Sequence, residues 1–265
     1  MALQVFVTEA HTHIATPPLL FVHGAWHSSW CWMEHFTGFF ADLGYTSYAV
    51  DLTGHGDSHG SLRTALISHY VSDVRKVAVA LPAEPVIIGH SMGGLIAQHY
   101  LTRYRARAGI LMAPVPTRGA IGATLRVACH HPRAFIRANA TFNLGPIVDE
   151  PERAINLLFG PDMDPRKAHQ YALRLQDESY LAYLEMILAL PRPSKVRDPM
   201  IVLGAERDAL FSVGEIEATA RAYGTQATIF EGMGHDMMLE PQWRLPAQTI
   251  ADWLAPSQVN KAGTN

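Results

Sequence analysis

Short apolar runs alternate with segments of helical periodicity from Leu19 onward, and this alternation limits the possible folds more than any other feature. Apolar runs at 19–22, 48–50 and 86–88 are each followed by apolar residues at helical spacing. Consecutive parallel strands need a long crossover connection, which is usually a helix. The sequence therefore predicts an α/β fold whose mostly parallel central sheet, of about six or seven strands, is flanked by helices on both faces.

The alternation is interrupted once, near the middle of the chain. Residues 114–190 have almost wholly helical patterns, and strand and helix patterns resume at 200–203. We therefore expect an α/β core formed by residues 1–113 and 191–256, with an inserted helical cap at 114–190. Residues 257–265 are expected to form a flexible tail.

Composition and charge limit the kinds of partner that the protein is expected to bind. The formal net charge of −3 gives no basic field, so we expect a small-molecule partner and no nucleic acid. No segment has the roughly 18 uninterrupted apolar residues of a membrane span, and residues 1–9 lack the features of a secretion signal. We expect a cytoplasmic protein without membrane insertion, of undetermined oligomeric state. Cys31 and Cys129 are expected to be free and buried.

A G-x-S-x-G motif occupies residues 89–93, directly between an apolar run and a helix pattern. In this context the serine lies on a strained strand-to-helix turn, and the glycines allow neighbouring chain segments to approach closely. Ser91 is therefore predicted to be a nucleophile. The alternative is a glycine-rich turn with an unreactive serine.

A serine nucleophile needs a general base, and the base needs a carboxylate that orients it. In this fold the three follow in the order Ser, Asp or Glu, His. His235 lies in a short glycine-rich loop after the last strand pattern, and Asp208 follows the strand pattern at 200–203. The end of that strand lies at the sheet edge where open α/β sheets bind ligands. We predict Ser91, Asp208 and His235 as the catalytic residues.

Three other acidic residues are rivals to Asp208, namely Glu206, Glu231 and Asp236. Glu206 lies two residues earlier and could point the opposite way, whereas Glu231 shares the loop of the histidine. No acidic residue occurs in residues 85–148, which removes the end of the strand before the cap as a position for the acid. Asp208 could instead serve only as a helix cap.

Charge that develops on the substrate oxygen needs preorganised backbone donors. The amide of Met92 begins the helix after the nucleophile and supplies one. The Ala25 amide is the second candidate, because Gly24 lets its loop bend over the serine; a simple turn is the alternative. We predict no metal site. The residues assigned to substrate binding lie near these positions along the chain and are Trp26, His90 and Met233.

Together these motifs resemble those of the α/β-hydrolase superfamily, from about residue 19 to residue 254. Five landmarks match in order: F-V-H-G-A-W at 21–26, D-L-T-G-H-G-D-S at 51–58, G-H-S-M-G at 89–93, G-A-E-R-D at 204–208 and G-M-G-H-D-M-M-L-E-P at 232–241. The opening H-G-A-W-H-S-S-W-C-W is also similar to that of plant methylesterases and hydroxynitrile lyases. The resemblance implies carboxylesterase, lipase, lactonase or thioesterase activity without a cofactor.

Three departures from related patterns refine this expectation. Epoxide hydrolases and haloalkane dehalogenases resemble this layout but use aspartate at the elbow, where this chain has Ser91. Hydroxynitrile lyases place a lysine just after the histidine, where this chain has Asp236. Fewer than twenty residues precede Leu19, so the usual N-terminal hairpin is expected to be reduced to one strand at 3–8.

The leading hypothesis is hydrolysis of a carboxylic ester, lactone or thioester of a small, largely apolar substrate through an acyl-enzyme. One alternative is a ligand receptor of the same fold with slow or no turnover. Another is a non-hydrolytic enzyme, such as a cofactor-free oxygenase or a perhydrolase. The sequence does not identify the acyl or alcohol group.

The first part of the expected cap carries four arginines and no acidic residue. They are Arg118, Arg126, Arg133 and Arg137. Arginines at a pocket mouth would favour substrates with a distant negative charge. The plainer interpretation is a solvated helix face.

Overall fold

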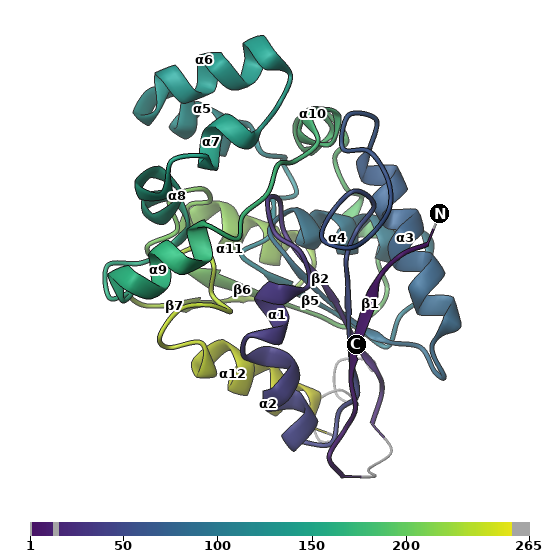
Figure 1. The fold of residues 1–265 in the computed structure, drawn as a ribbon. Helices are drawn as coiled ribbons and strands as arrows, with labels where there is room; N and C mark the ends of the chain where they lie inside the picture. The colour runs from purple at the N-terminus through teal and green to yellow at the C-terminus, as the bar shows by residue number, and fades with distance from the viewer. Residues whose placement is uncertain (1, 13–15, 256–265) are drawn as a thin grey trace.

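The computed structural model describes residues 2–12 and 16–255, and its centre is a seven-stranded sheet in the order β1-β3-β2-β4-β5-β6-β7 (Figure 1). The strands are β1 (Val5–Thr8), β2 (Leu19–Val22), β3 (Ser47–Val50), β4 (Val86–His90), β5 (Ala108–Met112), β6 (Met200–Ala205) and β7 (Ala227–Phe230). Only β1 runs antiparallel to its neighbour, and the other pairs are parallel. The predicted fold class is thus confirmed.

Helices cover both faces of this sheet (Figure 1). One face carries α1 (Trp30–Met33), α2 (Phe36–Asp42) and α12 (Arg244–Leu254). The other carries α3 (Ile67–Ala80), α4 (Met92–Arg103) and α11 (Val213–Ala222). Strands β2, β4 and β5 are consequently buried along their whole length, which explains why they are continuous apolar runs rather than alternating ones.

The chain between β5 and β6 forms six further helices, which lie beyond the sheet in Figure 1. They are α5 (Ile121–His130), α6 (Pro132–Thr141), α7 (Gly145–Val148), α8 (Pro151–Leu158), α9 (Pro165–Ala172) and α10 (Tyr180–Leu188). A short 3-10 helix, Pro193–Lys195, leads back to β6. The division into a core and a separate cap domain stays a prediction, and the expected tail at 257–265 lies outside the described residues.

The structure differs from the sequence prediction in local details. The helix pattern between Trp32 and Leu43 is broken into α1 and α2, because His35 leaves the helical region with φ −140°. The N-terminal strand is shorter than expected and begins at Val5. Cys31 is free and buried, but Cys129 is free and exposed. Its helix turns Ala123 and Val127 inward, and a residue two positions beyond Val127 faces the other way.

The helices in the described part of the chain do not meet the requirements of a membrane span. None of them is both long enough and apolar enough to cross a bilayer.

Helix α4 approaches the end of β2 so closely that residue 93 has no room for a side chain. A Cβ placed on Gly93 would overlap the carbonyl oxygens of Val22 and His23. We expect Gly93→Ala to lower the free energy of unfolding by at least about 1–3 kcal/mol, the range typical of overpacking, as measured by urea titration. Gly38→Ala is the matched control, because no heavy atom lies within 4 Å of its added Cβ. In the interior of α2 that change should raise stability by about 0.5–1 kcal/mol; equal effects of both substitutions would contradict the steric argument.

Candidate active site

Ser91 lies on the turn between β4 and α4 in a backbone conformation that non-glycine residues rarely adopt, with φ 53° and ψ −117°. Neighbouring chain holds it there. Its amide donates a hydrogen bond to the Met112 carbonyl at the end of β5, at 3.0 Å. Its own carbonyl accepts hydrogen bonds from the amides of Leu95 and Val115. The strained turn is therefore fixed by the strand beside it and by the helix that follows it.

The loop after β2 passes directly over this turn. A Cβ on Gly24 would lie 3.0 Å from the Cβ of Ser91 and 2.9 Å from Nδ1 of His90, so only glycine fits without a shift of these side chains. The expected close approach of the 23–26 loop to the elbow is present in the structure.

His235 and Asp208 come from the loops after β7 and β6. Nδ1 of His235 donates to Oδ2 of Asp208 at 2.7 Å, and both side chains are almost completely buried. The other oxygen of Asp208 accepts hydrogen bonds from the amides of Leu210 and Phe211. Asp208 therefore orients the imidazole while its own carboxylate is held by two backbone donors.

Protonation of His235 reflects two opposing effects. Burial alone lowers the pKa of His235, but the charge and hydrogen bond of Asp208, with a contribution from Asp236, raise it above its ordinary value overall. A base of this kind loses its function when the pH falls through its raised pKa.

The rivals to Asp208 lie elsewhere. Glu206 accepts a hydrogen bond from the amide of Gly232 and is exposed, as is Glu231. Asp236 is fully buried and pairs with His27 at 3.0 Å. Of the four acidic residues considered from the sequence, only Asp208 forms a hydrogen bond with the His235 side chain within residues 2–12 and 16–255.

Four further histidines are buried near the elbow: His23, His27, His55 and His90. Of these, only His90 is assigned a role from the sequence, as a substrate-binding residue. His23, His55 and His90 lie inside the glycine-containing landmarks and His27 follows the first of them, which was the available signal. His90 donates from Nε2 to the His235 carbonyl at 3.0 Å, and the two rings lie 4.7 Å apart. Burial and the neighbouring His235 lower the pKa of His90 to about 3, so its ring is neutral.

Three consecutive carbonyls of the loop at 24–26 each accept a hydrogen bond at 2.8 Å. The Gly24 carbonyl accepts from Nδ1 of His23, and the Ala25 carbonyl accepts from Nδ1 of His27. The Trp26 carbonyl accepts from the amide of Gln176. Trp26 itself has a positive φ of 64°. We call residues 24–26 the oxyanion loop, after the donor role predicted for the Ala25 amide; each of its three carbonyls is held by a different donor residue.

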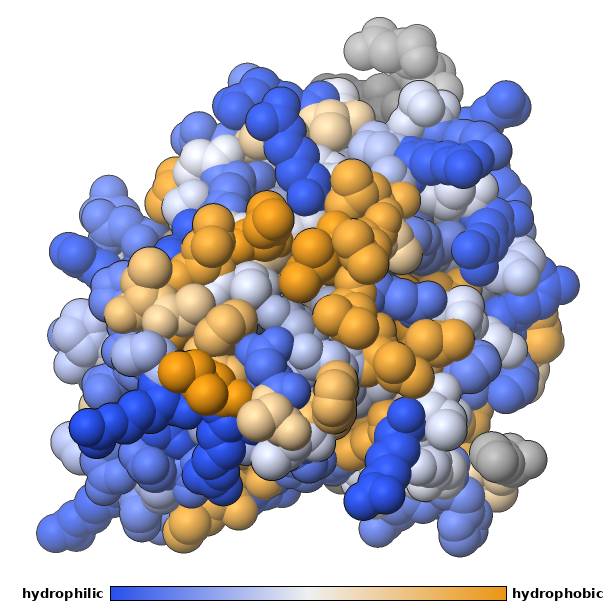
Figure 2. Space-filling view, turned by 90° about the horizontal axis from the view of Figure 1, so that it is seen from above, coloured by the Kyte–Doolittle hydropathy of each residue, from blue (hydrophilic) through white to orange (hydrophobic). Residues whose placement is uncertain are grey.

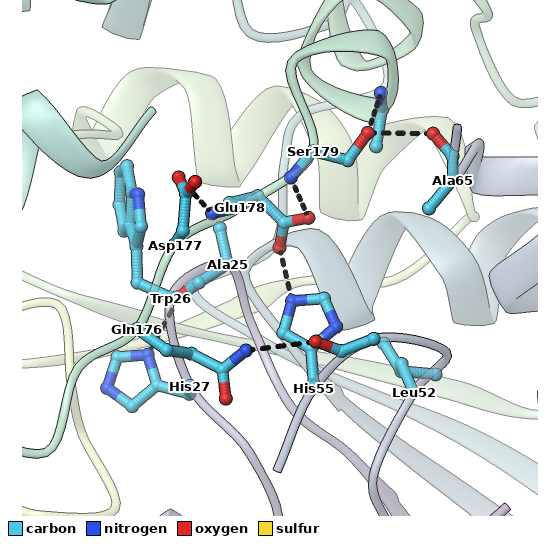
Figure 3. Close-up of polar contacts among 12 residues, drawn as sticks. Ala25, Trp26, His27, Leu52, His55, Ala65, Gln176, Asp177, Glu178 and Ser179 are labelled. Atoms are coloured by element: carbon cyan, nitrogen blue, oxygen red, sulfur yellow. Dashed lines mark hydrogen bonds and ion pairs between the residues drawn. The ribbon is translucent and has the colours of Figure 1, made fainter. Parts of the chain in front are cut away.

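The donor to Trp26 belongs to the segment before α10, which Figure 3 shows reaching across to the core. Glu178 of this segment is buried and accepts hydrogen bonds from His55 at 3.0 Å and from Tyr70 at 2.9 Å. Ser179 donates to the Ala65 carbonyl at 2.7 Å. Burial lowers the pKa of His55, but Glu178 outweighs it and raises that pKa overall. These bonds attach the helices between β5 and β6 to the core beside the site.

The predicted oxyanion donors remain available. Within residues 2–12 and 16–255, neither the Ala25 amide nor the Met92 amide has a recorded hydrogen-bond acceptor. Met92 is the first residue of α4, so the helix dipole adds to the positive potential at its amide. Their role as an oxyanion hole is a prediction.

Ser91 opens into a cavity with about 640 Å³ of space, its mouth included. Helices α5, α6, α7 and α10 supply most of the wall. Its lining is largely apolar and consists of Ala25, Trp26, Ser91, Val115, Ala120, Ala123, Thr124, Val127, Phe135, Ala138, Asn139, Leu144, Ile147, Tyr183, Met186, Leu210 and Phe211. The side chains of Tyr183 and Asn139 bond to other protein groups, to Thr124 and Tyr180 respectively. The cavity therefore offers mainly an apolar surface.

The three predicted substrate-binding residues lie in different places. Trp26 lines the cavity, and its indole donates to the Leu144 carbonyl. His90 and Met233 are fully buried and are not part of the lining, so contact of either with substrate stays a prediction.

The four arginines singled out in the sequence also lie outside the lining. Arg126 binds the Leu210 carbonyl and Glu215, and Arg137 pairs with Asp149. The expected contact with a charged substrate therefore gains no support from the cavity.

Several large apolar side chains are exposed on the helices between β5 and β6. Figure 2 looks down on the molecule from above and shows apolar residues gathered on this face. The exposed ones on α5, α6 and α10 are Ile121, Leu125, Ile136, Leu181 and Leu188. Both the cavity wall and the outer surface of these helices are thus rich in apolar groups.

One group within the described residues could bring three metal ligands together, since atoms of His90, His235 and Asp236 lie within 4.8 Å of one another. Existing hydrogen bonds already use these side chains. His90 donates to a carbonyl, His235 to Asp208, and Asp236 accepts from His27. These hydrogen bonds account for the closeness of the three side chains.

Comparison with known proteins identifies the family of the chain. The sequence profile described as "Alpha/beta hydrolase family" matches residues 19–246, which include the whole site. The chain belongs to this family.

Curated relatives are similar in sequence to parts of the chain. Pheophorbidase of Raphanus sativus is 36% identical over 78 residues, covering 28% of this chain and 29% of that protein. A pimeloyl-[acyl-carrier protein] methyl ester esterase of Xylella fastidiosa is 34% identical over 108 residues, covering 38% of this chain and 37% of that protein. This chain thus spans well under half of both relatives. A monoacylglycerol lipase of Mycolicibacterium smegmatis is 24% identical over 238 residues, covering 83% of this chain and 82% of that protein.

The solved structures of two esterases share the fold of this chain. A thermophilic esterase from Thermogutta terrifontis superposes with a TM-score of 0.76 at 22% identity, covering 99% of this chain and 94% of that one. An esterase from Exiguobacterium antarcticum gives a TM-score of 0.74 at 16% identity, covering 95% of both chains.

The contact between Asp208 and His235 predicts a specific pH response. We expect Asp208→Asn to lower the plateau of kcat/KM for an ester by about 10⁴-fold, by analogy with other triads. Because the carboxylate raises the pKa of His235, its loss should also move the acid limb of the profile to lower pH. Steady-state rates measured from pH 4 to pH 9 test both effects.

Glu206→Gln is the matched control, since it changes the nearest rival carboxylate, which contacts Gly232 rather than His235. It should leave the acid limb in place and the plateau within about threefold, as expected for an exposed side chain. A larger loss in Glu206→Gln than in Asp208→Asn would reject our assignment of the acid.

Proposed function

We propose that this protein hydrolyses carboxylic esters, with Ser91 as nucleophile, His235 as general base and Asp208 as its orienting acid. The observation that carries the proposal is the opening of Ser91, on its strained turn, into an apolar cavity. The buried His235–Asp208 pair supports it. Relatives named esterase and lipase agree with the reaction class.

In the proposed mechanism Oγ of Ser91 attacks the substrate carbonyl carbon, and Nε2 of His235 accepts the hydroxyl proton. The imidazolium that forms is stabilised by Asp208, whose carboxylate faces Nδ1 at 2.7 Å. The C–O bond of the ester breaks as His235 returns the proton to the leaving alcohol. Water then attacks the acyl-enzyme carbonyl while His235 accepts a proton from it. His235 returns this proton to Oγ of Ser91 as the acyl–serine bond breaks, which releases the carboxylic acid and restores the serine.

The amides of Ala25 and Met92 are the proposed oxyanion donors. Both have free N–H groups within the described residues, and both neighbour the nucleophile in space or in sequence. Such donors lower the barrier because negative charge develops on the carbonyl oxygen only in the transition state.

We propose a small, largely apolar acyl or alcohol group as the part of the substrate that fills the cavity. The lining residues, mostly alanine, leucine, valine and aromatic side chains, offer dispersion contacts and few unsatisfied polar groups. A lactone or a thioester presents the same carbonyl and is tested beside the esters.

The first test is Ser91→Ala, assayed with chromogenic esters graded by acyl length, a lactone and a thioester. We expect loss of turnover by about 10⁶-fold, as in other triad enzymes, because no acyl-enzyme can form. Ser61→Ala is the control, since this exposed serine does not line the cavity, and it should retain normal turnover. If Ser91→Ala cleaved esters as fast as the unaltered protein, the mechanism would be wrong. Absence of turnover in both Ser91→Ala and Ser61→Ala would favour a ligand receptor. Turnover that depends on dioxygen or peroxide would favour a non-hydrolytic enzyme.

The second test fills the cavity. Ala138 on α6 is buried and lines it, so Ala138→Phe should raise KM or lower kcat for long acyl chains and spare acetate esters. We expect a change of at least about tenfold in the ratio of kcat/KM for the two substrates, equivalent to about 1.4 kcal/mol. Ala134→Phe is the matched control, because Ala134 is buried on the same helix outside the lining. Equal effects of the two substitutions on this ratio of kcat/KM would show that the cavity does not hold the acyl chain of the substrate.

A further inference from the structure

A second buried histidine–carboxylate pair lies beside the proposed triad. Asp236 directly follows His235 in the chain, and its Oδ2 lies 3.0 Å from Nε2 of His27. The side chains are 1% and 0% exposed, respectively, for His27 and Asp236. The proposed chemistry uses neither residue.

His27 connects this carboxylate to the oxyanion loop. Its Nδ1 lies 2.8 Å from the Ala25 carbonyl, which can only accept a hydrogen bond. Its Nε2 faces the Asp236 carboxylate. Each ring nitrogen therefore has to carry a hydrogen for both contacts to be hydrogen bonds. A continuous chain of contacts then runs from the residue after the catalytic base to the residue that bears the oxyanion donor.

The carbonyl that His27 binds belongs to the same residue as the proposed oxyanion amide. The Ala25 N–H lies in one rigid peptide plane with the Gly24 carbonyl, which His23 binds, and the Ala25 carbonyl lies in the next plane, which His27 binds. Because the planes on both sides of the Ala25 Cα are held, rotation about its φ and ψ is limited, and with it the orientation of the N–H. Oxyanion donors have to point at the position of the developing charge before the reaction begins. The His27 bond supplies one half of that constraint, and the His23 bond supplies the other.

Stability alone is a weak explanation for the pair. A buried ion pair often contributes no more to folding than well-packed apolar side chains would. Asp236 also leaves its Oδ1 without a hydrogen-bond partner within residues 2–12 and 16–255. Such an arrangement is costly for a residue whose only task is packing, and it occurs where two loops of the site meet.

We propose that His27 and Asp236 are positioning residues. They join the oxyanion loop to the loop that carries His235, and so hold the Ala25 amide in a fixed position relative to His235. The inference rests on the proposed function, since it assigns these residues to the oxyanion step of ester hydrolysis. Neither side chain lines the cavity, so they act through Ala25 rather than on the substrate.

The test uses Asp236→Ala, His27→Asn and the double variant in the full chain. We expect kcat for a chromogenic ester to fall about 10- to 100-fold in each single variant, the scale of a misplaced oxyanion donor. KM should change by less than about threefold, because substrate contacts in the cavity are intact. The double variant should lose no more than the worse single variant, since both break one chain of contacts. Asp236→Asn keeps a group that can hydrogen-bond His27 and should recover most of the kcat.

Asp198 provides the matched control. Its carboxylate is 1% exposed and pairs with Arg105 at 2.8 Å, near the start of β5 and away from the carboxyl edge. Asp198→Ala also removes a buried, paired carboxylate, and it should lower the unfolding temperature without changing kcat by more than about twofold.

Two further measurements separate positioning from general damage. Binding of a trifluoromethyl ketone, whose adduct places an oxyanion beside the donors, should weaken in parallel with kcat. The rate at which a fluorophosphonate labels Ser91 should fall similarly and does not depend on finding the natural ester. Thermal unfolding shows whether each variant is folded at the assay temperature.

The inference is overturned if folded His27→Asn and Asp236→Ala keep kcat and ketone affinity, or if the losses in the two variants multiply. It is also overturned if Asp198→Ala loses kcat equally at equal stability. Failure of the proposed function has a different signature, because the unaltered protein would then neither hydrolyse the ester panel nor be labelled at Ser91. In that case the positioning role is rejected together with the proposed function.

Discussion

The close approach of α4 to the end of β2 is the constraint on which the rest of the site depends. Gly93 lies against the carbonyls of Val22 and His23, and Gly24 lies against Ser91 and His90. These contacts leave the chain at Ser91 no relaxed conformation, so its positive φ persists because the sheet and helix around it determine it. The hydroxyl is thereby carried by the rigid centre of the fold rather than by a mobile loop.

Dense packing around this turn also explains the buried polar groups nearby. Backbone segments that meet so closely at the sheet edge have carbonyls that water cannot reach, and buried polar groups need partners. The partners here are imidazoles: His23 binds Gly24, His27 binds Ala25, and His90 binds His235. Burial lowers the pKa of His23 well below its ordinary value, which suits a neutral ring that donates through Nδ1 and accepts from Leu52 through Nε2.

Much of this arrangement could be predicted from local patterns, because the sheet, the elbow and the His235–Asp208 contact each leave a short sequence signature. The roles of His27 and Asp236 could not, since their partnership spans 209 positions and depends on how two loops fold over each other. The break between α1 and α2 and the exposure of Cys129 depend on packing in the same way. The residues that line the cavity could not be predicted either. Helical periodicity shows that one side of a helix is apolar, but it does not show what that side packs against.

The location of the cavity wall has an evolutionary consequence. Most of the lining comes from one uninterrupted stretch of chain between Ala120 and Met186, whereas Ser91, Asp208 and His235 lie outside it. Recombination or gradual divergence within that stretch could therefore exchange one specificity for another while the reactive groups are inherited unchanged. The attachment of Gln176 to Trp26 and of Glu178 to His55 sets the limit on such exchange. A transplanted segment would have to keep a backbone amide that bonds the Trp26 carbonyl and a carboxylate that bonds His55, or the recipient would lose the shape of its own site.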